Sequence, residues 1–415
     1  MLTAARQTAW TLVAITRYLA RLARNLIVLP VVIYRTIRLI VTDTNYEPDA
    51  DQLRAQLLLP LAEDTEAQDR KRRLDEIRDL VDRHDWDTLL ARLEAWEGAR
   101  RQTPGRSSLV TEALLTIREV ATPDPGAVVV RSDLIDAFED GLDDHPDNHL
   151  MAATVAMAHI GLGWHWRGEG YAVDISPIDE QRFIGHFTRA AEVLAPFDAI
   201  ERYSPALALA QYHLFACHPQ AGTLIEDWFA DWADLDPQSI NPYLLHGFQL
   251  LPRWFGADAA ALDHAALRAV AGSEDTLGRA AYPLLYLGTM EEADAEVLAR
   301  CDADLFLDGL RDLLERTPSQ HLVNRVAWQL HRAWKTRPIA PDNDDTARAV
   351  TALRARLGEG FRMVVSDYLH IGLPAVWGGE DETLWYVAQA FSDELQAGAT
   401  IRFGENGAEI DAAAR

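Results

Sequence analysis

Apolar residues recur at three- and four-residue intervals along most of this chain, which is the spacing that places them on one face of an α-helix. Clear examples are Leu74, Ile77, Leu80 and Val81, followed by Leu89, Leu90, Leu93 and Trp96. No stretch alternates apolar and polar residues over the length of a strand between turn signals, and the best strand candidate, 128–130, is only three residues long. The pattern therefore predicts an all-α fold.

Proline-containing turns divide this helical pattern into pairs of helices. An amphipathic helix, a proline turn and a second helix rich in Ala, Leu and His recur around Pro146, Pro196, Pro237 and Pro318. The spacing of the last three prolines indicates a pitch near 40 residues, with one degenerate unit. A helical hairpin of this size cannot bury its own apolar face, so neighbouring hairpins must stack to cover it. We therefore predict an α-solenoid of helical hairpins.

The first 42 residues follow a different pattern, because they contain six arginines and no acidic residue. At about 100° per residue, all six arginines fall within a sector about 100° wide, and most of the other residues are apolar. Pro30 interrupts the helix, which predicts two segments, 3–28 and 31–42. The sequence thus predicts a basic amphipathic leader whose membrane-contacting residues are Arg6, Arg17, Arg21, Arg24, Arg35 and Arg38.

Charge separates this leader from the rest of the chain. The protein has 39 basic and 64 acidic residues and a net charge of −25, yet the first 43 residues hold six of the basic residues and a single acid, Asp43. So acidic a body repels phosphate backbones, which argues against nucleic-acid binding. It would also repel an anionic bilayer, so the leader is the predicted contact with an anionic membrane surface, lying in the interface.

A membrane-spanning leader is the less favoured alternative, because its longest uncharged run in the second half, 25–34, is too short to cross a bilayer. Packing of the leader on the body or on a partner, or a targeting role, also stays open.

Cys217 and Cys301 lack a metal-type spacing, which favours a reducing compartment. The preference for arginine over lysine suggests a bacterium, so we expect a peripheral protein at the cytoplasmic face of the inner membrane.

Two tryptophan-containing elements resemble each other. Residues 250–258 read Leu-Leu-Pro-Arg-Trp-Phe-Gly-Ala-Asp, and residues 373–381 read Leu-Pro-Ala-Val-Trp-Gly-Gly-Glu-Asp. Both lie where one predicted helix ends and another begins, which favours a buried tryptophan at a helix junction; a loop that contacts a ligand is the alternative. The residues concerned are Pro252, Arg253, Trp254 and Gly256 in the first element, and Trp377, Gly378 and Gly379 in the second.

The first of these elements also carries a family resemblance, together with an earlier segment containing Trp164, Trp166, Arg167 and Gly168. Over residues 75–290 the chain resembles an uncharacterised bacterial family of TPR-like helical repeats, in which an aromatic-Arg-Gly segment precedes a hairpin and a Pro-Arg-Trp-Gly-Gly-Ser element follows. Phe255 and Ala257 depart from that element. The resemblance implies a TPR-like fold and transfers no activity.

Other candidate sites have a structural interpretation that we favour. His145 and His149 are four residues apart, but Pro146 is expected at a helix start, which would spoil a shared metal face. A second group, made of His213, Cys217 and His218, is expected to be buried packing. Arg167 and Arg253 are expected to pair with carboxylates; for Arg167 the candidates are Glu169 and Asp174. We predict neither a metal nor a cofactor.

These observations predict four parts: the leader, 1–43; N-terminal helical hairpins, 44–125; a TPR-like repeat body, 126–397; and a flexible tail, 398–415, with a short hairpin at most. The expected function is a non-catalytic scaffold, held at a membrane surface, that binds a protein partner. Because the body is acidic, a basic peptide or helix is the expected partner. The alternative is an enzyme, hydrolase-like, with a site near 164–170 and Trp254.

Overall fold

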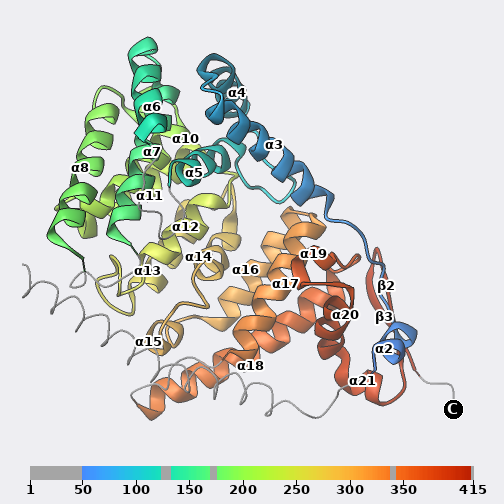
Figure 1. The fold of residues 1–415 in the computed structure, drawn as a ribbon. Coiled ribbons are helices and arrows are strands. Elements are labelled where there is room, and N and C mark those ends of the chain that lie inside the picture. The colour runs from blue at the N-terminus through green and yellow to red at the C-terminus, as the bar shows by residue number, and fades with distance from the viewer. Residues whose placement is uncertain (1–48, 123–131, 169–174, 337–342, 413–415) are drawn as a thin grey trace, which may run out of the picture.

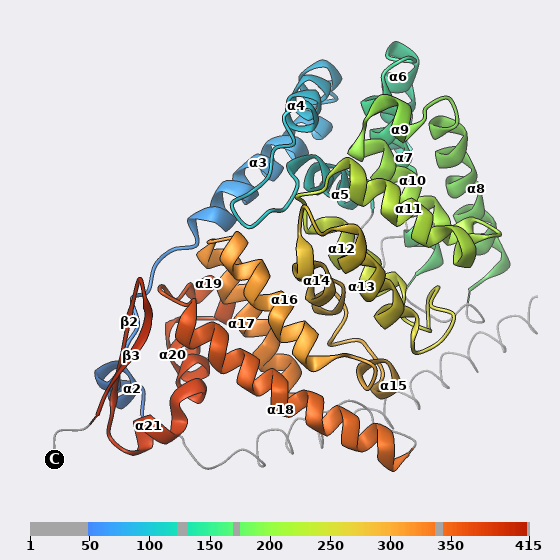
Figure 2. The same cartoon turned by 180° about the vertical axis from the view of Figure 1, so that it is seen from behind.

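The computed structural model describes residues 49–122, 132–168, 175–336 and 343–412, and most of these residues lie in helices joined by short turns (Figure 1; Figure 2 shows the opposite side). The prediction of a mostly helical fold is thereby confirmed. In the first half the helices are α2 (Ala50–Gln56), α3 (Thr65–Asp82), α4 (Trp86–Gly98), α5 (Leu109–Ala121), α6 (Ser132–Asp144), α7 (His149–Arg167), α8 (Pro177–Leu194), α9 (Ala199–Arg202) and α10 (Pro205–His213).

The second half continues with longer helices and several short ones. They are η2 (Leu214–Cys217), α11 (Ala221–Leu235), α12 (Asn241–Gln249), α13 (Ala261–Gly272), η3 (Gly278–Ala280), α14 (Ala281–Leu287), α15 (Ala295–Leu298), α16 (Ala303–Arg316), α17 (Gln320–Lys335), α18 (Asp344–Asp367), α19 (Pro374–Trp377), α20 (Glu380–Ala388), η4 (Gln389–Phe391) and α21 (Ser392–Gln396).

Local sequence explains where many of these helices begin. The side chains of Asp64, Asn148, Ser204 and Ser319 each accept a hydrogen bond from a backbone N–H in the first turn of the helix that follows. Such caps satisfy donors that have no partner within the helix. The predicted proline turns are present: they separate α6 from α7, α8 from α10, α11 from α12, and α16 from α17.

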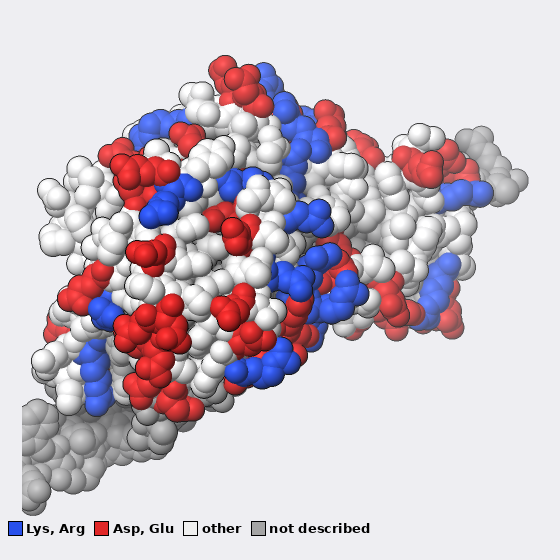
Figure 3. All heavy atoms as spheres, turned by 90° about the horizontal axis from the view of Figure 1, so that it is seen from above, with Lys and Arg blue, Asp and Glu red and all other residues white. Residues whose placement is uncertain are grey.

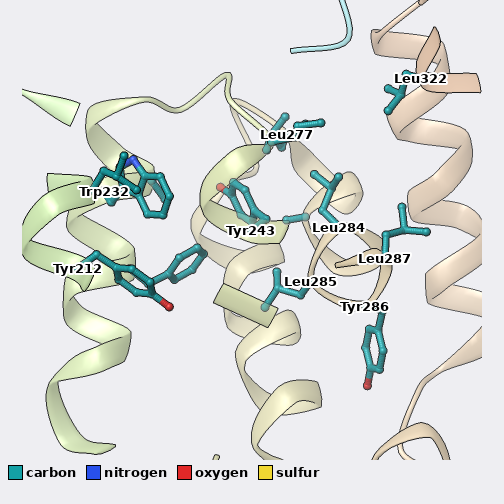
Figure 4. Packing of buried hydrophobic residues seen from close by; sticks show 14 of the residues in the cluster. Tyr212, Trp232, Tyr243, Leu277, Leu284, Leu285, Tyr286, Leu287 and Leu322 are labelled. Carbon is teal, nitrogen blue, oxygen red and sulfur yellow. The ribbon is translucent and has the colours of Figure 1, made fainter. Parts of the chain in front are cut away.

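Many helices pack against a neighbour in sequence, such as α7 against α8 and α17 against α18, and others pack against the next helix but one, such as α5 against α7. Their apolar faces form one continuous core. Large aromatic side chains fill the middle of this core, among them Tyr212 of α10, Trp232 of α11 and Tyr286 of α14 (Figure 4). Aromatic side chains from different helices therefore pack together in this core, as Tyr212 does with Trp232. The structure describes no helix that is long and apolar enough to cross a membrane.

A three-stranded sheet joins the two ends of the described chain. Strand β2 (Thr400–Gly404) pairs with β3 (Gly407–Asp411) in antiparallel register, and it also pairs in parallel with β1 (Leu57–Leu58), where Leu57 lies opposite Ile401. Ile401 and Phe403 are buried. Residues 400–411 of the predicted tail thus form the short hairpin that the sequence allowed, and this hairpin also has a parallel partner strand and a buried face.

Several predictions fall on residues outside the described ranges. These are the leader with its six arginines, the strand candidate at 128–130, and the boundary placed between residues 125 and 126. On either side of that boundary, α5 packs directly against α7. The N-terminal hairpins and the repeat body thus share one core.

Candidate functional site

The structure brings together the two segments on which the family resemblance rests. Trp164, near the end of α7, and Trp254, in the turn after α12, meet edge to face with ring centroids 6.0 Å apart. Phe183 and Phe187 of α8 pack against the other sides of Trp164, with ring centroids at 5.6 and 6.2 Å. Both tryptophans are half-buried. The ring contacts join α7, α8 and the turn after α12, so the aromatic cluster covers the junction of these three segments.

Polar and glycine residues of the same segments have local roles. Arg253 pairs with Glu292 at 2.8 Å and lies over the ring of Phe248, while the Trp166 ring stacks under Arg182 at 4.1 Å. Arg167 donates to the carbonyl of Gly168, which has a positive φ of 64° and ends α7. The predicted partners of Arg167, at 169 and 174, lie outside the described residues.

In the turn that contains Pro252, the backbone turns back tightly at Gly256. A Cβ atom on Gly256 would lie 2.0 Å from the carbonyl oxygen of Leu250, so only glycine fits there. The indole Nε1 of Trp254 is buried without a hydrogen-bond partner in the described part of the chain. We infer that residues 250–258 form a tight turn between α12 and α13.

The second tryptophan element lies in a different part of the molecule and is also a helix junction. Trp377 ends α19 and is buried, and its Nε1 donates to the side chain of Asn324 at 2.7 Å. Gly378 and Gly379 follow with φ values of 103° and 159°, and α20 begins immediately after them. The similarity between the two elements is one of local architecture, because their tryptophans have different partners.

The histidine candidates do not form shared sites. Helix α7 begins at His149 rather than at the preceding proline, and His149 contacts Glu97 at 2.9 Å, whereas His145 faces Asp87 at 3.5 Å. Among the residues that the structure describes, no group of three or more His, Cys, Asp or Glu side chains is arranged to hold a metal.

The second histidine and cysteine group lies where α10 ends and α11 begins. Burial and the nearby Arg118 lower the pKa of His213 to about 3, and burial raises the pKa of Cys217 to about 12. The imidazole is therefore neutral, and the thiol stays protonated near neutral pH. These shifts fit the packing role expected from the sequence and not a reactive thiolate.

A polar cleft of about 780 Å³ lies where the start of α3 meets the start of α17, and the turn before α5 forms its third wall. His321 lines this cleft, and its Nδ1 lies 2.6 Å from Asp64 Oδ2. Asp64 is buried, and its other oxygen caps α3 through the amide of Ala67. A buried carboxylate thus orients the imidazole.

Other charged groups around this cleft pair with one another. Glu66 accepts from the amide of Gly105 at 2.7 Å and from the hydroxyl of Ser319 at 2.5 Å. Arg70 pairs with Glu112 at 3.2 Å. These contacts join α3 to the turn before α5, to α5 and to the start of α17, so the cleft is a junction between segments that are distant in sequence.

A second hollow of about 570 Å³ continues from this cleft and shares residues 62–64 with it. We call it the acidic groove. Its apolar wall comes from the segment before α3, from α3 itself and from α19, and its charged lining has three carboxylates against one lysine. The residues concerned are Leu61, Ala62, Ala67, Pro374 and Ala375, with Glu63, Asp64, Glu380 and Lys71.

Elsewhere the surface carries both paired charges and clusters of carboxylates, such as Asp227, Asp231 and Asp234 of α11. Figure 3 shows acidic and basic side chains beside one another over the face that it views. Many of these are close pairs within one helix, such as Lys71 with Asp75 and Arg311 with Asp308. Paired charges of this kind attract a charged partner weakly. In the acidic groove, by contrast, the exposed carboxylates of Glu63 and Glu380 stand beside an apolar wall.

Sequence reasoning missed both hollows. Asp64 and His321 are 257 residues apart, and Glu63 and Glu380 even further, so no local spacing relates them. The signals in the sequence were Asp64 before the apolar pattern of α3 and Ser319 before that of α17. Such residues predict helix caps and do not predict a cleft. Comparison of the chain with protein-family models, with curated proteins and with solved structures finds no match.

Proposed function

We infer that the protein is a non-catalytic helical scaffold that binds a basic, amphipathic segment of a partner protein in the acidic groove, while its leader holds it against an anionic membrane surface. The observation that carries this proposal is the groove itself, which combines an apolar wall with the exposed carboxylates of Glu63 and Glu380. A helix with an apolar face flanked by basic residues matches both features.

The order of packing supports a TPR-like solenoid as the architecture of this scaffold. Helices α7 and α8, α10 and α11, α11 and α12, and α13 and α14 pack as neighbours, and α14 then packs on α16. Each pair buries an apolar face that it could not bury alone. Solenoids of this kind present extended surfaces to peptides and helices, which fits a binding role.

Charge supports the proposed location. The net charge of −25 would keep the body away from an anionic bilayer, and the six leader arginines are the concentrated positive charge that could overcome this repulsion. We propose that the protein lies at the cytoplasmic face of a bacterial inner membrane. Nucleic acid is not among the proposed partners, because its backbone is anionic as well.

The groove is tested by titrating a helical peptide of leucine and lysine into the chain in which the six leader arginines are replaced by glutamine. We expect binding in 0.05 M salt that weakens at least about tenfold in 0.5 M salt, because the carboxylates act through screened charge. The double variant Glu63→Lys/Glu380→Lys should lose this binding. Binding that ignores both salt and charge reversal contradicts the proposal.

The leader is tested by co-sedimentation of the full chain with vesicles of phosphatidylcholine and phosphatidylserine. The chain should sediment with phosphatidylserine present, and replacement of the six arginines by glutamine should abolish this, because each basic residue contributes about 1 kcal/mol near an anionic surface. Equal sedimentation of both chains would rule out the arginines as the membrane contact.

A hydrolase-like enzyme is the second candidate, and one observation favours it. His321 lines the polar cleft with its Nδ1 held by buried Asp64, which is the arrangement of a general base whose Nε2 acts on a substrate. If the protein is an enzyme, we place its site in this cleft. The region of Trp164 and Trp254, where the sequence suggested such a site, offers mainly aromatic packing.

A further inference from the structure

The acidic groove lies close to the point where the leader joins the described chain. Helix α2 packs along α20, and Arg54 of α2 pairs at 2.5 Å with Asp381, the neighbour of the groove residue Glu380. The first described residue, Asp49, is about one and a half helical turns from Arg54. Six further residues, which span at most about 22 Å, connect it to residue 43. The end of the leader is therefore tethered beside this groove.

The nearest part of the leader has the chemistry that the groove fits. Residues 31–42 read Val-Val-Ile-Tyr-Arg-Thr-Ile-Arg-Leu-Ile-Val-Thr, so they offer many aliphatic side chains and two arginines. The groove offers aliphatic side chains and proline, with Glu63 and Glu380 exposed beside them. In water, this segment would leave its aliphatic side chains exposed unless something covered them.

We propose that residues 31–42 of the same chain occupy the acidic groove when the protein is away from a membrane, and that an anionic bilayer draws them out. The inference rests on the proposed function, since the leader is treated as an internal copy of the basic partner segment. A short tether raises the effective concentration of the leader to the millimolar range, so weak contacts are sufficient. A bilayer engages all six arginines, whereas the groove meets only Arg35 and Arg38, so the bilayer competes successfully.

The consequence is that membrane binding and partner binding are coupled. Off the membrane, the leader blocks the groove; on the membrane, the groove is free for a partner. Since both events draw on the same segment, each must favour the other by the same factor.

The docking is tested in the full chain by measuring a distance between two spin labels. The labels are placed by Thr36→Cys in the leader and Ala375→Cys at the groove, in a background with Cys217→Ser and Cys301→Ser. We expect one short, narrow distance in solution. It should broaden when phosphatidylserine vesicles are added, and also in the Glu63→Lys/Glu380→Lys variant. A broad distribution in solution, or a short distance that survives charge reversal, overturns the proposal.

Vesicle affinity gives an independent readout. Charge reversal at the groove should release the leader, so Glu63→Lys/Glu380→Lys should sediment at a several-fold lower concentration of phosphatidylserine vesicles than the wild type. Glu180→Lys/Glu201→Lys is the matched control, because it changes the net charge by the same amount. Glu180 of α8 and Glu201 of α9 are also exposed acids in the first turn of a helix, and both helices lie on the opposite side of the molecule from α20 in Figure 2.

The two readouts separate the possible failures. If Glu63→Lys/Glu380→Lys gains no more vesicle affinity than Glu180→Lys/Glu201→Lys, the docking proposal is wrong even though the membrane role stands. If no form of the chain sediments with vesicles, the proposed membrane function fails, and the effect of charge reversal on the spin-label distance still decides whether the leader docks.

Discussion

Glu97 of α4 is a buried carboxylate that joins three helices. It contacts His149 at the start of α7 at 2.9 Å, and it accepts from the hydroxyl of Ser204 at 2.6 Å and the amide of Ala206 at 3.1 Å at the start of α10. Burial raises its pKa, but the bonds from His149, Ser204 and Ala206 outweigh burial and hold the pKa below its ordinary value. Glu97 is thus ionised at neutral pH, and both of its carboxylate oxygens make polar contacts.

Truncation of Glu97 should destabilise the protein strongly. Glu97→Ala removes the shared acceptor and leaves a buried hydroxyl and amide unpaired, which costs about 3 kcal/mol in the free energy of unfolding. Urea unfolding followed by circular dichroism measures this change. Glu119→Ala is the control, because Glu119 is an exposed acid that pairs with Arg78 at the surface, and its loss should cost less than about 1 kcal/mol. Equal losses for the two variants would contradict the role given to Glu97.

Helices α12 and α14 approach each other so closely that glycine is required on both. A Cβ atom on Gly247 would lie 2.0 Å from the carbonyl oxygen of Leu285, and one on Gly288 would lie 2.2 Å from that of Leu244. The obstacle in each case is backbone, which cannot rotate away as a side chain can. These two glycines therefore set the distance between the two helices.

Alanine at two helical glycines should have opposite effects on stability. Gly247→Ala should force α12 and α14 apart and cost about 2 kcal/mol or more. Gly185→Ala in α8 should stabilise the protein by up to about 1 kcal/mol, because nothing lies within 4 Å of the added carbon and alanine favours helix. Thermal unfolding of the two variants and of the wild type measures the direction of each change in stability. A Gly247→Ala variant as stable as the wild type would disprove the close approach of the two helices.

At the scale of elements, local pattern predicted the helices well and the sheet badly. The three-four spacing of Leu74, Ile77, Leu80 and Val81 marks the buried face of α3, because a helix buries a stripe that its own sequence repeats. Strand β1 has only two residues, and its partner β2 lies more than 340 residues away. Such a pairing depends on the rest of the fold and leaves no local signal.

The same reason limits prediction of the candidate site. Trp164 and Trp254 were singled out because each stands in an unusual local sequence, and the fold brings them together. Asp64, His321 and Glu380 stand in ordinary helix-start sequences, and only tertiary structure makes them neighbours of one cleft and groove. Local sequence therefore identified helix corners, whereas the hollows arise from packing of distant segments.

Across the part of the molecule that the structure describes, burial lowers the pKa of four histidines, His159, His186, His213 and His246, and the shift is large for the last three. Burial, with the adjacent His159, lowers the pKa of His186 to about 4. Burial also lowers the pKa of His213 and of His246 to about 3, helped by nearby arginines. The three residues lie on α8, α10 and α12, so protonation of any of them would disturb packing between different helices.

This arrangement predicts that acid weakens the fold well before the carboxylates are protonated. In an unfolded chain these histidines take up a proton near pH 6.5, whereas in the folded chain they do so only near pH 4 or below, so the unfolded state binds more protons in that window. The free energy of unfolding should therefore be highest above pH 6.5 and fall steadily from pH 6.5 to pH 4.5.

Urea unfolding at pH 7.5, 6.0 and 5.0 measures the slope of the free energy of unfolding against pH. His186→Asn should make that slope shallower, because one of the histidines with a lowered pKa is gone. A stability that stays level between pH 7.5 and 5.0 would show that the histidines are not held neutral. The depressed pKa of Glu97 adds a further loss only at lower pH, as the carboxylate itself becomes protonated, so the two causes are separated by the pH at which each begins.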